Sequence, residues 1–182
     1  MSEIVATYDV RVSGFWNQTH TLSKDGVVIG SLHLQRGPWG MMIGGRFVPE
    51  KGEQLLMRRD PGLLRSQYSL WTDGHEWLGS ALRWSFFGRQ VVLHTGSKPL
   101  RMLPTAKPGF GWTLQAPRTG EMARVLGTPL ARRRRIEVTR KVDFELVIFS
   151  YFLGVQILGE SWLSGPSLEA LLPPSAPKAT ST

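Results

Sequence analysis

Residues 144–158, with the sequence FELVIFSYFLGVQIL, are apolar on almost every side of a helix, and few folds accommodate such a segment. At about 1.5 Å per residue this helix would be only about 22 Å long, whereas a membrane-spanning helix needs roughly 20 apolar residues. Glu145 lies inside the segment and Glu160 follows it. A helix that is apolar all round is packed on all sides, so we predict a buried helix over residues 144–158 that ends at Gly159.

The sequence before this helix predicts short strands separated by turns. Near the N-terminus, apolar residues alternate with polar or smaller ones, at Ile4, Ala6, Tyr8, Val10 and Val12. This period of two is typical of a strand with one buried face. Glycines inside later strand patterns predict bulges or tight curvature, at Gly30, Gly79 and Gly88. One strand is predicted to turn a single apolar face to the core, with Leu78, Leu82, Trp84 and Phe86.

A turn containing glycine recurs along the chain before apolar strand patterns. Gly26, Gly74 and Gly120 are 48 and 46 residues apart. Such turns favour hairpins because glycine adopts positive φ without steric cost. A propeller has blades of similar length but needs about four or more of them, and this chain has room for three. We therefore expect a mainly β fold, a single antiparallel barrel that encloses the C-terminal helix.

Length and composition agree with one domain over residues 1–163. The 182 residues include 20 glycines and 12 prolines, too many for a helical bundle. The absence of cysteine excludes disulfides, thiolate nucleophiles and metal sites built on cysteine. The sequence begins without a basic and apolar leader, so we expect the protein in the cytoplasm. Residues 164–182 are rich in proline and serine and are predicted to form a disordered tail.

Three segments near the C-terminus carry a resemblance to a known family. Residues 119–125 (TGEMARV), 134–138 (RRIEV) and 142–148 (VDFELVI) together resemble the tubby-like C-terminal barrel superfamily, most closely its LURP-one-related and phospholipid scramblase-like branches. The resemblance covers about residues 20–160. In that family a strand pair with a glycine turn leads into an aspartate and then an apolar helix, which fills the barrel axis.

The resemblance implies a tubby-like barrel and a function at membranes. Tubby-type members bind phosphoinositide head groups through basic residues on the barrel surface, and scramblase-like members are associated with membranes and calcium. This chain lacks a cysteine that could be palmitoylated and an acidic calcium loop near its helix. Lipid scrambling is therefore not expected.

The main candidate site is a run of basic residues within a net charge of +8, namely Arg132, Arg133, Arg134, Arg135, Arg140 and Lys141. Adjacent guanidinium groups repel one another unless water or anions surround them, and their planar forks suit phosphate oxygens. Strand alternation predicts that Arg133, Arg135 and Lys141 share the outer face with Glu137 and Thr139. Ile136 and Val138 would face inward, and Arg134 and Arg140 would lie at the barrel rims.

Two alternative functions remain open from the residues alone. Tryptophans stand near arginines in the sequence, with Trp84 beside Arg83 and near Arg89, and Trp71 near Arg65. Aromatic rings beside cations are used to bind single-stranded nucleic acid, although tryptophans also fill wide barrel cores. The second alternative is an interaction or structural protein that docks through its C-terminal tail, residues 164–182.

Nothing in the sequence specifies an enzyme. The four histidines, His20, His33, His75 and His94, have no spacing typical of metal ligands. Nucleophile-elbow, dinucleotide-binding and phosphate-loop motifs are incomplete or absent. We therefore predict a non-enzymatic module without metal or cofactor that binds anionic ligands. The expected ligands are phospholipid head groups at the cytoplasmic face of the membrane, bound by Arg132, Arg133, Arg135 and Lys141.

Overall fold

The computed structural model describes residues 3–15, 17–37, 42–60, 66–83, 90–96, 99–105, 111–127 and 131–163. Ser66, Pro104 and residues 157–163 are described by their backbone. The predicted tail of residues 164–182 lies outside this set, as do Trp84, Phe86 and Gly88.

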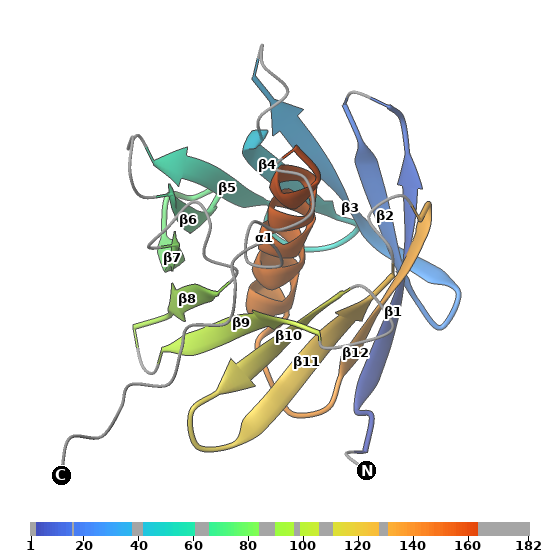
Figure 1. Cartoon of the computed structure of the whole chain (residues 1–182). Coiled ribbons are helices and arrows are strands. Elements are labelled where there is room, and N and C mark those ends of the chain that lie inside the picture. Colours follow the sequence, from blue (N-terminus) through green and yellow to red (C-terminus); the bar gives the residue numbers. More distant parts are fainter. Residues whose placement is uncertain are drawn as a thin grey trace, which may run out of the picture.

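Twelve antiparallel strands form a closed barrel (Figure 1). Their bounds are β1 (Ala6–Ser13), β2 (Thr19–Lys24), β3 (Val27–Arg36), β4 (Met42–Pro49), β5 (Leu55–Asp60), β6 (Ser66–Thr72), β7 (Trp77–Arg83), β8 (Val91–His94), β9 (Leu100–Pro104), β10 (Gly111–Ala116), β11 (Gly120–Leu126) and β12 (Arg133–Val138). Each strand pairs with its neighbours in sequence, and β1 pairs with β12 to close the ring. The predicted antiparallel barrel is confirmed.

The recurring turns mark hairpins placed every four strands around the barrel. They join β2 to β3, β6 to β7 and β10 to β11. In each of these hairpins the register shifts by one residue, which leaves one extra residue on the second strand, at Ile29, Leu78 and Met122. The bulges predicted near Gly30 and Gly79 are therefore confirmed. Gly30 has no room for a side chain, because an added Cβ would lie 2.7 Å from the carbonyl oxygen of Val48.

The predicted core face of β7 is confirmed at Leu78, the extra residue of the bulge, which packs against the core. Beyond the bulge it is wrong, because Ala81 and Arg83 are buried, whereas Leu82 is half-buried on the opposite side of the strand. Ala81 lies opposite Tyr68 of β6, and the ring of Tyr68 packs edge-on against a helical phenylalanine. The small side chain of Ala81 leaves volume for these rings, which a leucine facing the same way would occupy.

The C-terminal helix α1 (Phe144–Leu163) is five residues longer than predicted. It begins after Asp143, whose carbonyl oxygen accepts the N–H groups of Leu146 and Val147 at 3.1 and 3.2 Å. The predicted end at Gly159 is wrong, since the helix continues through this residue. A glycine ends a helix when it adopts a left-handed conformation, and inside a helix it costs only about 1 kcal/mol relative to alanine.

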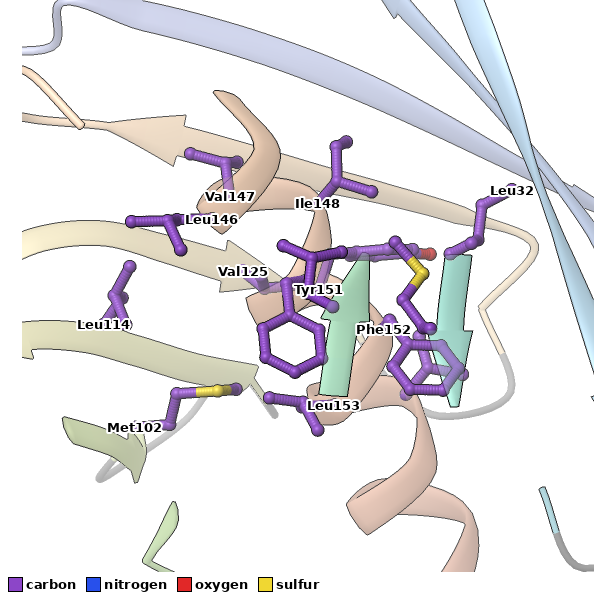
Figure 2. Packing of buried hydrophobic residues seen from close by; sticks show 14 of the residues in the cluster. Leu32, Met102, Leu114, Val125, Leu146, Val147, Ile148, Tyr151, Phe152 and Leu153 are labelled. Carbon is purple, nitrogen blue, oxygen red and sulfur yellow. The ribbon is translucent and has the colours of Figure 1, made fainter. Parts of the chain in front are cut away.

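Residues 146–156 of α1 are all buried, and they contact strands in different parts of the ring. The ring of Phe152 lies 3.0 Å from the position of a Cβ on Gly45 of β4, and the ring of Trp112 of β10 is equally close to that of Gly154. In Figure 2, Leu146 and Leu153 point toward Leu114 of β10 and Met102 of β9. Two glycines therefore allow large aromatic side chains to pack closely between helix and strands.

Among the described residues, no helix combines the length and the hydrophobicity that are needed to cross a membrane.

Candidate functional site

The barrel has two rims that differ in their connections. The turn end carries the β2–β3, β6–β7 and β10–β11 turns and the start of α1. At the opposite rim β1, β3, β5 and β7 end and β12 begins, and α1 runs toward this rim (Figure 1). Phe144 packs against Phe47 near the turn end, and Gln156 donates a hydrogen bond to Tyr68 close to the other rim.

Charge is distributed unequally between the rims. We counted the three strand residues nearest each rim together with the described residues that connect the strands there. The rim opposite the turns, called the basic end below, has one carboxylate, Asp60, against ten arginines: Arg11, Arg36, Arg58, Arg59, Arg83, Arg124, Arg132, Arg133, Arg134 and Arg135. Arg124 is the one farthest from the rim, and its Nε lies 2.7 Å from Oε2 of Glu137. By the same count, with residues 139–143 before α1 included, the described part of the turn end has six basic groups and eight carboxylates. Such a separation gives the surface a potential that attracts anions to one rim only.

Three of the four predicted contact residues lie together at the basic end. Arg132, Arg133 and Arg135 are exposed at the start of β12. They gain a neighbour that the sequence analysis missed, because Arg11 of β1 stands directly opposite Arg133 in the register of the pair and is also exposed. The pairing of the first strand with the last creates this cluster, and local sequence patterns carry no signal for it.

Lys141 does not belong to this cluster. It is exposed, but it follows the other end of β12 and therefore lies at the turn end. The five steps along β12 alone separate the two ends by about 17 Å. The expectation that Lys141 shares a surface with Arg133 and Arg135 is wrong, because strand alternation fixes the face of the sheet but not the position along the barrel.

One carboxylate approaches the outer cluster. Nε of Arg135 lies 3.2 Å from Oδ1 of Asp9, and both side chains are more than half exposed. An ion pair as exposed as this contributes little to stability, typically less than about 1 kcal/mol. Asp9 lowers the positive charge of the cluster but leaves it basic.

The sequence analysis predicts Arg134 at the surface of a barrel rim, and this is wrong. Its side chain points into the barrel. It is 7% exposed, and its Nη1 donates to the hydroxyl of Tyr151 on α1 at 3.4 Å. The same hydroxyl is hydrogen bonded to Nδ1 of His20 on β2 at 2.6 Å. Arginine, tyrosine and histidine from β12, α1 and β2 thus form a buried polar cluster among the apolar core residues.

Burial and charge shift the pKa values of this buried cluster. Burial, and then the positive charges of Arg134 and Arg36, lower the pKa of His20 to about 3. Burial raises the pKa of Tyr151 to about 12, although Arg134 opposes this shift. Both groups are therefore neutral near pH 7. The effect on His20 also places Arg36 of β3 close to the same interior region.

Three further arginines face the interior at the basic end, and the sequence analysis missed them. Arg36, Arg59 and Arg83 follow the alternation of the buried residues on their strands, after Leu34, Met57 and Ala81. Arg83 is 6% exposed, and Arg36 and Arg59 are half-buried. The sequence signal for an inward-facing arginine is its position at the end of a strand, two residues after a buried residue of that strand.

The described tryptophans do not form a stacking surface beside the arginines. Trp112 is buried against α1, and Trp71 lies opposite Trp77 at the turn end, where Trp77 is 43% exposed. Arg83, expected beside Trp84, points into the barrel. Trp84, Arg89 and Arg65 lie outside the described residues.

A cavity of about 270 Å³ lies at the turn end and not beside the arginines. Its lining includes the carboxylates of Glu53, Asp143 and Glu145. Oε1 of Glu53 accepts the backbone N–H of Gly74 at 2.7 Å. An acidic lining disfavours phosphate, so this cavity does not extend the basic site. In the described residues, histidines and carboxylates form no group of three or more that could hold a metal ion.

No protein-family model, curated protein or solved structure matches the chain.

Proposed function

We propose that this protein is a non-enzymatic module that binds anionic phospholipid surfaces through the basic end of its barrel. One observation carries the proposal, namely that ten of the described arginines gather at a rim with a single aspartate, while the opposite rim is acidic. A flat, negatively charged surface matches a whole rim better than a small anion does. The acidic turn end then faces away from the membrane.

The outer arginines supply the attraction. Arg11, Arg132 and Arg133 are exposed, and Arg135 is exposed beside Asp9. Each basic residue near an anionic leaflet contributes roughly 1 kcal/mol, and guanidinium forks bind phosphate oxygens in a bidentate manner. The four together would contribute about 4 kcal/mol, equivalent to roughly a thousand-fold in affinity.

The sequence of the connecting segments supports the same rim. Phe15, between β1 and β2, is 92% exposed. Residues 38–41, 61–65, 84–89, 106–110 and 128–130 lie outside the described residues and connect strand ends at this rim. Their sequence contains no aspartate or glutamate, and it adds three basic residues and five aromatic ones, namely Arg65, Arg89, Lys107, Trp39, Trp84, Phe86, Phe87 and Phe110. Aromatic and basic side chains together are typical of membrane interfaces.

We further propose a tubby-like barrel that encloses α1 and acts at the cytoplasmic face of the membrane. The buried residues 146–156 and the helix contacts with β2, β4, β6, β10 and β12 support an enclosed helix. Amide hydrogen exchange tests this arrangement, because an enclosed helix should exchange among the slowest segments of the chain. Exchange of α1 faster than that of the strands would contradict it.

Co-sedimentation with vesicles tests the lipid proposal. The chain should bind vesicles of phosphatidylcholine mixed with phosphatidylserine and not vesicles of phosphatidylcholine alone. Replacing Arg11, Arg132, Arg133 and Arg135 by glutamine should weaken binding by two to three orders of magnitude, by the same estimate of roughly 1 kcal/mol per charge. A matched control removes four exposed charges from the turn end, with Lys24, Lys51, Arg118 and Lys141 replaced by glutamine. The control should bind nearly as well as the unmodified chain.

Two outcomes would overturn the proposal. Equal losses in the two variants would show attraction by net charge without a preferred rim. Binding to single-stranded oligonucleotides that is tighter than binding to vesicles at the same salt concentration, with quenching of tryptophan fluorescence, would favour nucleic acid as the ligand.

A further inference from the structure

We propose that the interior of the basic end binds a phosphate-bearing group, such as the phosphomonoester of a lipid head group, through the inward-facing arginines Arg36, Arg59, Arg83 and Arg134. This inference rests on the proposed function, and it adds a second site with a different task. The outer arginines attract any anionic surface, whereas the inner arginines select the chemistry of the head group.

All four arginines face the barrel interior at the same end because of their positions on their strands. They come from β3, β5, β7 and β12, always at the basic end and always in the inward phase of the alternation. Arg83 and Arg134 are more than nine-tenths buried. Tyr151 of α1 joins the group through its hydrogen bond with Arg134. The buried His20 is also hydrogen bonded to Tyr151, and the positive charges of Arg36 and Arg134 help to lower its pKa.

The charge balance of this interior favours an anion. Of the carboxylates whose side chains the structure describes, Asp60 is the nearest to this rim, and it faces outward on β5, where it accepts a hydrogen bond from Ser69 of β6. Glu160 lies on the part of α1 described by its backbone and adds at most one negative charge. The guanidinium groups have partners within the protein, so a bound anion would add to these contacts. Four positive charges in a low-dielectric interior repel one another strongly, and a group with two negative charges offsets this repulsion.

Phosphate is the anion that this set of donors fits best. Guanidinium groups donate in parallel pairs to phosphate oxygens, and a phosphomonoester has three terminal oxygens and close to two negative charges at neutral pH. A carboxylate or a phosphodiester carries one negative charge and fewer free oxygens. We therefore expect a preference for lipids with a terminal phosphate over lipids such as phosphatidylserine.

Two probes separate a lipid head group from free phosphate compounds. In the first arm, the full chain is titrated with inorganic pyrophosphate at constant ionic strength, followed by calorimetry. In the second arm, vesicles of phosphatidic acid and of phosphatidylserine are compared after adjustment to equal surface charge. Saturable binding of pyrophosphate with one site per chain, together with at least tenfold tighter binding to phosphatidic acid, is the expected result for a head group. Binding of pyrophosphate without a preference between vesicles would assign the site to a free phosphate compound and overturn the lipid assignment.

Variants of the two half-buried arginines distinguish this site from the outer cluster. Replacing Arg36 and Arg59 by glutamine should weaken pyrophosphate binding at least tenfold and abolish the preference for phosphatidic acid, while binding to phosphatidylserine persists. The variant that lacks the four outer arginines should bind pyrophosphate as the unmodified chain does but bind phosphatidylserine vesicles much more weakly. If the inner arginines only stabilise the fold, their replacement would lower the stability without changing either preference, and the proposal fails. Absence of saturable pyrophosphate binding by the unmodified chain overturns it without any variant.

Discussion

Acidification should destabilise this protein through one buried imidazole, that of His20. Its side chain is fully buried between β2 and α1, and its pKa is lowered to about 3 by burial and by the charges of Arg134 and Arg36. In the unfolded chain the pKa of a histidine is about 6.5. Between these two pH values His20 binds a proton in the unfolded state but not in the folded state, so the free energy of unfolding falls as the pH falls.

The size of this effect follows from the shift. A difference of about 3.5 pKa units corresponds to roughly 5 kcal/mol over the whole range from pH 6.5 to pH 3. Between pH 7 and pH 5 the expected loss from His20 is about 2 kcal/mol. Above pH 7 both states are neutral at this residue, and His20 no longer contributes to the pH dependence.

Urea unfolding at pH 7 and pH 5 measures this loss. Other groups also titrate in this range, so the informative quantity is the difference between the unmodified chain and His20→Gln, which should lose about 2 kcal/mol less on acidification. His33→Gln is the matched control, because His33 is exposed on the outer face of β3. Equal pH dependence in His20→Gln and the unmodified chain would refute the assignment.

A second measurement needs no variant. The ring resonances of His20 in the folded protein should not titrate between pH 7.5 and pH 5, because the imidazole stays neutral throughout. A titration midpoint near pH 6 in the folded state would mean that the contact with Tyr151 and the two arginines does not shift the pKa of His20 as described.

Three further changes test the packing and the charge pattern. Phe152→Ala should lower the free energy of unfolding by about 3–5 kcal/mol in urea, because its ring is fully buried, and a loss below about 1 kcal/mol would contradict close packing. Gly154→Val should cost about 1–3 kcal/mol and change the fluorescence of Trp112, since even the first added carbon lies 3.0 Å from that ring; an unchanged stability and spectrum would speak against the contact. Asp9→Asn should change stability by less than about 1 kcal/mol and strengthen binding to anionic vesicles about fivefold, whereas weaker binding would argue against the outer cluster as the contact surface.

The sequence predicted the architecture because local and periodic signals carried it. Glycine turns spaced by 48 and 46 residues correspond to hairpins four strands apart in the closed barrel. The glycines Gly30 and Gly79 marked the register shifts. The helix start after Asp143 followed from the apolar segment that begins at Phe144, while its end was predicted five residues too early because Gly159 does not end the helix.

The candidate site was predicted only in part, because its assembly depends on pairings between distant strands. Arg11 joins Arg133 only because β1 pairs with β12. Lys141 was misplaced, since its position along the barrel depends on where β12 ends. The inward direction of Arg59 and Arg83 depends on the register of β5 and β7. Arginine is ordinarily an exposed residue, so a sequence pattern alone predicts it on the outer face.

The contact of the basic end with a membrane can be measured directly with a fluorescent label at each rim. The chain has no cysteine, so Ser13→Cys at the basic end and Thr119→Cys at the turn end each provide a single labelling position, and both residues are exposed. On vesicles that contain phosphatidylserine, an environment-sensitive dye at residue 13 should shift its emission to the blue, while the same dye at residue 119 should stay unchanged. Equal shifts at the two positions, or a shift at residue 119 alone, would contradict binding through the basic end.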